Sequence, residues 1–214
     1  MTHSIADIRK DYSSEKLSEE RIPADPIQQF GIWWNEAIKS EIDEVNAMTL
    51  ATASSDGFPS ARIVLLKGYD ENGFIFFTNY QSFKGTQLEE NPKACLVFFW
   101  KELERQVRIT GFVTKTSEKE SDTYFKSRPF ASQIGAVVSP QSRVIQDRNT
   151  LDTKFNKLSV ELNEKELKRP PHWGGYCVRP VIMEFWQGRT SRLHDRIQYT
   201  LTEKGNWKIE RLAP

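Results

Sequence analysis

The sequence has few of the residues that build metal centres and disulfides. Its two cysteines, Cys95 and Cys177, lie in separate segments without CxxC spacing, and only three histidines accompany them. One of these, His3, lies in a polar N-terminal region, which argues against a three-histidine metal site. We therefore expect no metal, and we interpret both cysteines as small buried residues rather than ligands or a disulfide.

Long hydrophobic runs and a secretion signal are also lacking. No apolar stretch approaches the roughly 20 residues of a membrane-spanning helix. The first residues have neither the basic flank nor the apolar stretch of a signal peptide. We therefore expect a cytoplasmic protein without a membrane partner.

The sequence carries almost no net charge, because its 30 basic residues nearly cancel its 29 acidic residues. A general positive field that would attract nucleic acid is therefore absent, and any anion site must come from a local cluster. GxGxxG, Walker A, HExxH and GxSxG motifs are absent too, which disfavours dinucleotide folds, P-loop NTPases, zincins and serine hydrolases.

The pattern of elements predicts one domain that is mainly β with helices. Residues 1–24 are polar and highly charged, so we expect a flexible N-terminal arm before a body that spans residues 25–214. Asp25 as N-cap and Pro26 at the first helical position predict a helix that ends near Asp43. Further helices are expected over residues 82–90, 118–126, 129–138 and about 146–163.

The predicted strands follow one another mostly through hairpins. An Asp56-Gly57 turn joins strands over residues 48–53 and 61–67, and a Gly205-Asn206 turn joins strands over 197–200 and 207–209. Other strands are expected over residues 74–79, 94–100, 106–114, 176–178 and 182–186. Since regular βαβ alternation is absent, a small antiparallel barrel decorated by helices fits better than a doubly wound sheet.

One segment is dense in aromatic, arginine and histidine residues. It reads E-F-W-Q-G followed by R-L-H-D-R, from Glu184 to Arg196. In an arbitrary sequence it would be a strand followed by a solvated loop. Here it resembles the C-terminal signature of the pyridoxamine 5′-phosphate oxidase family. The agreement extends to Arg62–Lys67, Leu103–Val107, Ser127–Pro129, Ser132–Ala136, Gln141-Ser142, Trp173–Gly175 and Arg211–Pro214.

The resemblance implies a fold, a cofactor and a reaction. The implied fold is an antiparallel FMN-binding split β-barrel, assembled as a homodimer with active sites shared between subunits. The implied reaction oxidises pyridoxamine 5′-phosphate or pyridoxine 5′-phosphate with O2, giving pyridoxal 5′-phosphate and H2O2. Hydride passes from the substrate C4′ to flavin N5, so the cofactor carries the difficult step and the protein aligns two flat rings.

The resemblance also assigns residues to the two ligands. FMN contacts fall on Arg62, Ile63, Val64, Leu65, Leu66, Lys67, Phe77, Thr78, Lys84, Gln106, Gln141, Ser142, Trp186 and Arg196. Substrate contacts fall on Arg9, Tyr12, Lys67, Tyr124, Arg128, Ser132, Arg192 and His194, with Arg192 and His194 as the catalytic pair over the pyridine ring. Cations, hydroxyls and amides of this kind suit a phosphate dianion.

Several of these residues have structural alternatives. Arg196 is also explained by an ion pair with Asp195 or Glu184. Tyr124 also fits an amphipathic core aromatic, and Arg128 fits a cation at a helix C-terminus. The remaining alternatives are a pair of cations at strand ends for Arg62 and Lys67, and ordinary strand packing for Gln106 and Trp186.

Phe83 departs from the family pattern, which commonly has an arginine there beside the lysine that corresponds to Lys84. An expected phosphate contact is therefore missing or supplied elsewhere. Two other classes compete with the oxidase, namely a related split-barrel flavin reductase and a flavin-binding or chaperone-like module without turnover. Arg128, Ser132, Arg192 and His194 favour the oxidase, because a binding-only protein needs no second phosphate site.

Overall fold

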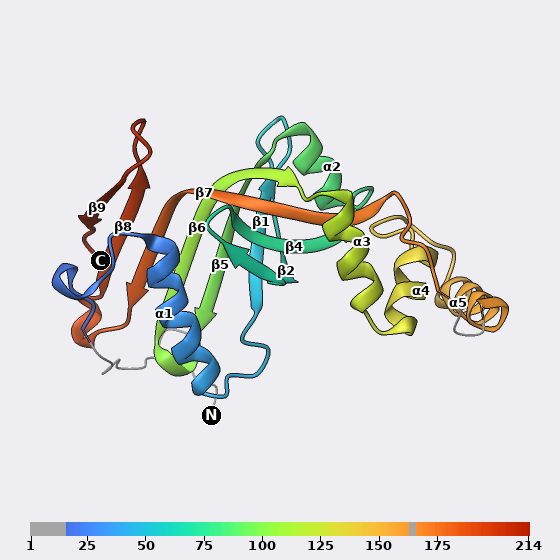
Figure 1. The fold of residues 1–214 in the computed structure, drawn as a ribbon, viewed down its shortest axis with the longest axis horizontal. Helices are drawn as coiled ribbons and strands as arrows, with labels where there is room; N and C mark the ends of the chain where they lie inside the picture. The colour runs from blue at the N-terminus through green and yellow to red at the C-terminus, as the bar shows by residue number, and fades with distance from the viewer. Residues whose placement is uncertain (1–15, 163–165) are drawn as a thin grey trace, which may run out of the picture. The chain divides into compact units, whose positions relative to one another are not determined.

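The computed structural model describes residues 16–162 and 166–214 (Figure 1). Its α-helices are α1 Pro26–Lys39, α2 Phe83–Glu90, α3 Glu118–Ser127, α4 Phe130–Val138 and α5 Arg148–Leu162. Short 3₁₀ turns are η2 Glu19–Arg21, η3 Lys101–Leu103 and η4 Thr190–Arg192. The strands are β1 Ala47–Ala53, β2 Pro59–Leu65, β3 Gly68–Asp70, β4 Gly73–Asn79, β5 Lys93–Trp100, β6 Arg105–Lys115, β7 Trp173–Gln187, β8 Asp195–Leu201 and β9 Trp207–Arg211.

The strands hydrogen-bond in the order β2-β1-β5-β6-β7-β4-β3, and β8 pairs with β7 and β9. Tight turns at Gly57 and Gly205, with φ of 89° and 79°, adopt a backbone conformation that glycine tolerates without strain. The chain folds into two compact units. The first unit contains residues 16–49, Cys95–Gly111 and Pro180–Pro214, and the second contains Leu50–Ala94 and Phe112–Arg179.

The first unit is built on aromatic contacts between α1 and the strands β5 and β7. The side chain of Asp25 caps α1 by accepting a hydrogen bond from the Ile27 backbone nitrogen at 2.8 Å. Phe30 then packs against Phe98 of β5, with ring centroids 5.3 Å apart, and Trp33 meets Phe185 of β7 edge-on at the same distance. These residues form the apolar core that supports the β7–β8 pair.

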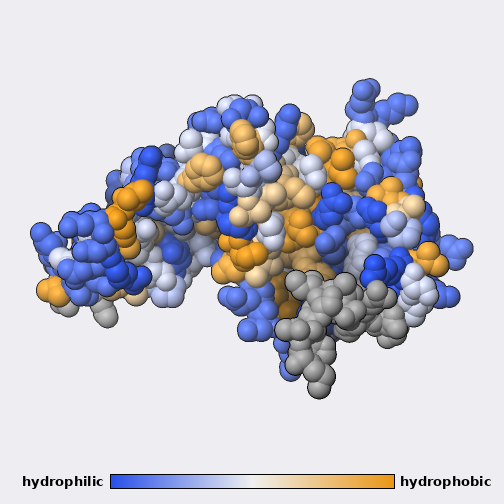
Figure 2. Space-filling view, turned by 180° about the vertical axis from the view of Figure 1, so that it is seen from behind, coloured by the Kyte–Doolittle hydropathy of each residue, from blue (hydrophilic) through white to orange (hydrophobic). Residues whose placement is uncertain are grey.

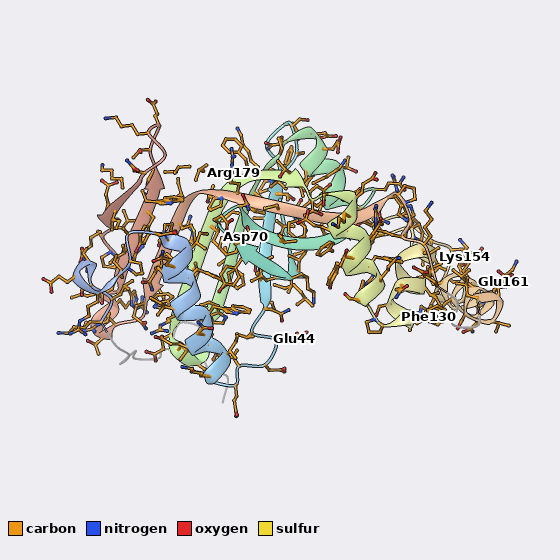
Figure 3. The ribbon with its side chains drawn as sticks, in the orientation of Figure 1. Glu44, Asp70, Phe130, Lys154, Glu161 and Arg179 are labelled. Atoms are coloured by element: carbon orange, nitrogen blue, oxygen red, sulfur yellow. The ribbon has the colours of Figure 1, made fainter. Side chains whose placement is uncertain are left out.

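The second unit pairs β4 with the first half of β7 and packs helices beside them. Phe77 lies opposite Gly175, and its ring stacks on Tyr124 of α3 with centroids 3.9 Å apart. Ser82 caps α2 and Ser117 forms a capping box with Glu120 at the start of α3. Helices α4 and α5 pack together, and Figure 3 labels Phe130 at the start of α4 and Lys154 and Glu161 on α5.

A side chain larger than hydrogen at Gly175 would break the contact between β7 and α3. An added Cβ would lie 2.4 Å from Thr116 Oγ1 and 2.8 Å from a ring carbon of Phe77. The glycine therefore allows the segment that leads into α3 to approach the strand closely. Because α3 carries Tyr124, this close approach helps to fix one wall of the cavity described below.

The predicted elements are largely confirmed, and the structure differs from the predictions in three details. The first helix ends at Lys39 rather than near Asp43, because Glu41 adopts a left-handed φ of 52°. The two strands expected over 176–178 and 182–186 form one strand, β7, which continues through Pro180. This proline lies between the residues that pair with β4 and those that pair with β8. The third difference is β3, a three-residue strand that was not predicted.

The predicted N-terminal arm, residues 1–24, stays a prediction, since residues 1–15 lie outside the described residues. Of the following residues, Leu17 is buried, and Arg211 donates hydrogen bonds to its carbonyl oxygen and to the Glu19 carboxylate. This ion pair lowers the pKa of Glu19 to about 2.

Hydrophobic side chains also occur at the surface (Figure 2). The described residues with large exposed apolar side chains include Phe58, Ile63, Phe83, Phe99 and Phe112. None of the helices in the described residues has the length and apolar character needed to cross a membrane.

Candidate functional site

The second unit contains a cavity of about 680 Å³. It is lined by Arg62, Ile63, Val64, Leu65, Lys67, Phe77, Thr78, Asn79, Lys84, Tyr124, Arg128, Pro129, Ser132, Gln141 and Trp173. Strands β2 and β4, helices α2, α3 and α4, and the start of β7 supply these residues. A cavity of this size holds an organic ligand of several rings.

Four cations line this cavity without a carboxylate partner among the described residues: Arg62, Lys67, Lys84 and Arg128. Lys84 is only 9% exposed, and the Nη1 atom of Arg128 is buried without any hydrogen-bond partner. Buried cations and unpaired donors are costly unless an anion compensates them. This arrangement therefore fits a ligand that carries one or more phosphate groups.

Burial changes the acid strength of Lys84, Arg62 and Arg128. Burial lowers the pKa of Lys84, and the nearby positive charge of Arg62 lowers it further. Burial also lowers the pKa of Arg62 and of Arg128. In each case the charged form is disfavoured until a negative group enters the cavity.

A small polar cluster surrounds Lys84. Its Nζ atom donates to Thr78 Oγ1 at 3.3 Å, and the Thr78 hydroxyl donates to Gln141 Oε1 at 3.2 Å. Lys84 is on α2 one residue after Phe83, whose side chain is 58% exposed and does not line the cavity. The helix therefore turns the lysine inward and the phenylalanine outward.

A second polar group lies where α3 ends and α4 begins. Arg128 is the C-cap of α3, with extended backbone, and its guanidinium lies 4.6 Å from the ring centre of Trp173. Ser132 occupies the first turn of α4, and its backbone nitrogen donates to the Pro129 carbonyl oxygen. Arg128 therefore lies just after α3, and Tyr124, Arg128 and Ser132 line one cavity.

The first unit holds Gln106 on β6, and it holds Trp186, Arg192, His194 and Arg196 in and around the loop that joins β7 to β8. The rings of Trp186 and His194 lie 4.6 Å apart, and His194 Nδ1 accepts a hydrogen bond from the Arg189 backbone nitrogen at 3.1 Å. Burial and the charge of Arg192 lower the pKa of His194. Both effects favour a neutral imidazole.

The backbone of this loop is strained at two residues. Ser191 and Arg192 have left-handed φ angles of 56° and 60°, which cost L-residues free energy and recur at functional sites. The loop is therefore not extended at these two residues. Arg192 instead ends the turn η4.

The ion pair with Glu184, given above as an alternative explanation of Arg196, is present. Arg196 Nε donates to Glu184 Oε1 at 2.8 Å, and Arg108 Nη1 donates to Glu184 Oε2 at 3.0 Å. Glu184 is 5% exposed, while its two arginine partners remain partly accessible to water. Since Nη1 of Arg196 also donates to the Ala213 carbonyl oxygen, the guanidinium is fixed from two directions.

The structure thus gathers most of the predicted FMN and phosphate residues in one cavity, with clear exceptions. Leu66 is buried and Ser142 is exposed, and neither lines the cavity. Arg9 and Tyr12 lie outside the described residues. Gln106, Trp186, Arg192, His194 and Arg196 belong to the first unit. Asn79, Pro129 and Trp173 line the cavity but were not predicted as ligand contacts; only the Trp173-Gly174-Gly175 motif hinted at one of them.

Comparison with known proteins agrees with this description. Residues 34–160 match the family described as pyridoxamine 5′-phosphate oxidase, and residues 173–214 match the pyridoxine 5′-phosphate oxidase C-terminal dimerisation region. A pyridoxine/pyridoxamine 5′-phosphate oxidase of Nostoc punctiforme is 54% identical over 214 residues, covering 100% of both chains. One from Salinibacter ruber is 54% identical over 212 residues, covering 98% of this chain and 99% of the relative.

Solved structures agree on the fold. PhzG from Burkholderia lata, in complex with tetrahydrophenazine-1-carboxylic acid, is 32% identical with a TM-score of 0.88, covering 94% of this chain and 100% of that one. A pyridoxamine 5′-phosphate oxidase-related FMN-binding protein from Nostoc punctiforme gives a TM-score of 0.70 at 16% identity, covering 89% and 98%.

The strand pairing and the solved relatives define an antiparallel split-barrel protein, and its second unit contains a cavity lined by cations. The chain belongs to the pyridoxamine 5′-phosphate oxidase family. The predictions of family, fold class and enzyme class are thereby confirmed.

Proposed function

We propose that this chain oxidises pyridoxamine 5′-phosphate or pyridoxine 5′-phosphate with O2, producing pyridoxal 5′-phosphate and H2O2, with FMN as its cofactor. The observation that carries the proposal is the cavity whose four cations lack carboxylate partners among the described residues. Two phosphorylated ligands, cofactor and substrate, account for so many positive groups. The curated relatives, identical at 54% over their full length, bear the name of this activity.

The residues around Lys84 fit the phosphate of FMN. Arg62 and Lys84 supply positive charge, while Thr78 and Gln141 supply hydroxyl and amide groups beside them. Charge-assisted hydrogen bonds of this kind are worth about 1.5–3 kcal/mol each. When bound, FMN would supply the redox chemistry, by taking two electrons from the substrate and passing them to O2.

The residues between α3 and α4 fit the phosphate of the substrate. Tyr124, Arg128 and Ser132 line the same cavity, and Lys67 lies on its wall. The buried, unpartnered Nη1 atom of Arg128 is a donor that a phosphate oxygen would satisfy. By holding this remote group, the protein would restrict the orientation of the substrate ring.

By resemblance, the first unit contributes Gln106, Trp186 and Arg196 to the flavin, and Arg192 and His194 to the substrate. Because Nδ1 of His194 accepts from the Arg189 backbone nitrogen, a neutral His194 carries its proton on Nε2, which can donate a hydrogen bond to the substrate. Arg196, held by Glu184, would stabilise negative charge near the cofactor. We propose that two copies of the chain form a homodimer with shared active sites; residues 173–214 match the family's dimerisation region.

Flavin reduction tests the proposed function directly. The purified protein should be yellow, with one FMN per subunit, and anaerobic mixing with pyridoxamine 5′-phosphate should bleach the flavin absorbance. Admission of O2 should restore the colour. A colourless protein that ignores added FMN would overturn the proposal, and a yellow protein that is not bleached would be a flavin-binding module without this turnover.

Substitutions in the β7–β8 loop should separate substrate binding from cofactor retention. We expect Arg192→Ala and His194→Ala each to lower kcat/KM for pyridoxine 5′-phosphate by about tenfold or more, because each removes a polar contact to the reacting ring. The bound FMN content, measured by absorbance after gel filtration, should stay unchanged.

Arg189→Ala is the matched control for this loop. Among the described residues the Arg189 side chain forms an ion pair with Asp195 alone, at 3.9 Å, so its removal should leave kcat/KM nearly unchanged. Wild-type kinetics in the Arg192 and His194 variants would remove both residues from the site. Loss of FMN from them would assign them to the cofactor instead.

A further inference from the structure

Arg62 is held in the cavity wall by neutral acceptors. Its Nη1 atom donates to Thr52 Oγ1 at 2.7 Å and to the Leu50 carbonyl oxygen at 3.1 Å. Neither acceptor carries a charge, and Arg62 makes no ion pair within the part of the chain that the structure describes. These bonds therefore fix the direction of the guanidinium without neutralising it.

The Thr52 hydroxyl is itself fixed by a glutamine. It donates its single proton to Gln87 Oε1 at 2.6 Å, so its lone pairs are left to accept from Arg62. The amide nitrogen of Gln87 in turn donates to Ser60 Oγ at 3.3 Å. Thr52 and Gln87 are each 3% exposed, so water has little access to replace either group. Buried polar chains of this kind have one low-energy arrangement.

This chain of hydrogen bonds connects Arg62 to the helix that carries Lys84. Gln87 and Lys84 are three residues apart on α2, so they lie on one side of the helix. The two cations are close enough for Arg62 to lower the pKa of Lys84. Without a fixed support, two like charges would turn away from each other. The network therefore holds Arg62 beside the cavity in the absence of an anion, while Lys84 is held by its hydrogen bond to Thr78.

We infer that Thr52 and Gln87 are positioning residues, which preorganise Arg62 for the phosphate monoester of the cofactor. Neither side chain lines the cavity, so both act through Arg62 rather than on the ligand. The inference rests on the proposed function, because it takes the anion to be the phosphate of FMN. Preorganisation lowers the cost of ordering the arginine when the ligand binds.

Thr52→Val tests the inference, because it keeps the shape of the side chain and removes only the hydroxyl. The apoprotein should bind FMN about tenfold more weakly, as measured by quenching of flavin fluorescence, because the guanidinium loses one of its two supports. Thr52→Ser restores the hydroxyl and should return the dissociation constant to within about twofold of wild type.

A double-mutant cycle distinguishes positioning from a general loss of stability. In an Arg62→Met background, Thr52→Val should change FMN affinity by less than about twofold, because the group that it positions is gone. Thr116→Val is the matched control, since the Thr116 hydroxyl hydrogen-bonds Ser121 rather than Arg62. It should leave FMN affinity unchanged even if its melting temperature falls as far as that of Thr52→Val.

Equal losses of affinity with and without Arg62, or an equal loss in Thr116→Val, would overturn the positioning role. If Thr52→Val bound FMN as tightly as the wild-type protein, the positioning role would also be overturned, but the proposed function would stand. If the unmodified protein fails to bind FMN at all, both the proposed function and this inference fall together.

Discussion

The phosphorylated substrate is expected to be oxidised with a kcat/KM at least about a hundredfold higher than that of the unphosphorylated vitamer, a difference of about 3 kcal/mol. The reason is the cationic group formed by Lys67 and Arg128 together with the donors Tyr124 and Ser132. Without a phosphate these groups would face an empty region of the cavity, and the buried Nη1 atom of Arg128 would stay unpaired. Steady-state oxidation of pyridoxine and pyridoxine 5′-phosphate measures the ratio.

Arg128→Met should reduce the preference for the phosphorylated substrate, because it removes one of the groups that bind the phosphate. The methionine keeps an unbranched side chain beside Trp173 but removes the charge, so kcat/KM for pyridoxine 5′-phosphate should fall by about 10- to 150-fold. The value for unphosphorylated pyridoxine should barely change. Arg148→Met is the control, because Arg148 is an exposed helix residue that pairs only with Asp152. Equal losses on both substrates would mean that Arg128 maintains the structure rather than recognising phosphate.

The starts of two helices and the hairpin turns were predictable because one local residue determines each of them. Asp25 and Ser82 accept backbone hydrogen bonds at helix starts, and Gly57 and Gly205 supply positive φ. The continuity of β7 through Pro180 was not predictable in this way. A proline normally interrupts a strand, and only the change of partner from β4 to β8 around this position makes it acceptable.

The candidate site was predictable only where the family motif marks it. Arg62 and Lys84 were named from the resemblance, while the pattern of the residues alone favoured cations at strand ends for Arg62. Thr52 and Gln87 were missed, because a threonine in a strand and a glutamine in a helix carry no sequence signal. Their importance depends on distances of 2.7 and 2.6 Å between side chains 10 and 35 residues apart. Only the folded structure brings such groups together.

Lys84 is expected to make the largest single contribution to binding of the FMN phosphate. Lys84→Met keeps the aliphatic part of the side chain and removes a cation that is 9% exposed. Loss of a charge-assisted hydrogen bond of about 1.5–3 kcal/mol should weaken FMN binding by about 10- to 150-fold. Fluorescence titration of the apoprotein measures this change, and riboflavin, which lacks the phosphate, should bind wild type and variant equally.

Phe83→Arg, at the neighbouring residue, should change FMN affinity much less than Lys84→Met does. The Phe83 side chain is 58% exposed and does not line the cavity, so an arginine there should improve FMN affinity by only about 0–1 kcal/mol, at most roughly fivefold. Any gain should disappear at high salt, because an exposed charge is screened within about 10 Å at 0.1 M ionic strength. A gain of tenfold or more that persists in high salt would mean that residue 83 reaches the phosphate directly. If Lys84→Met also bound FMN as tightly as wild type, the phosphate would not lie at the start of α2.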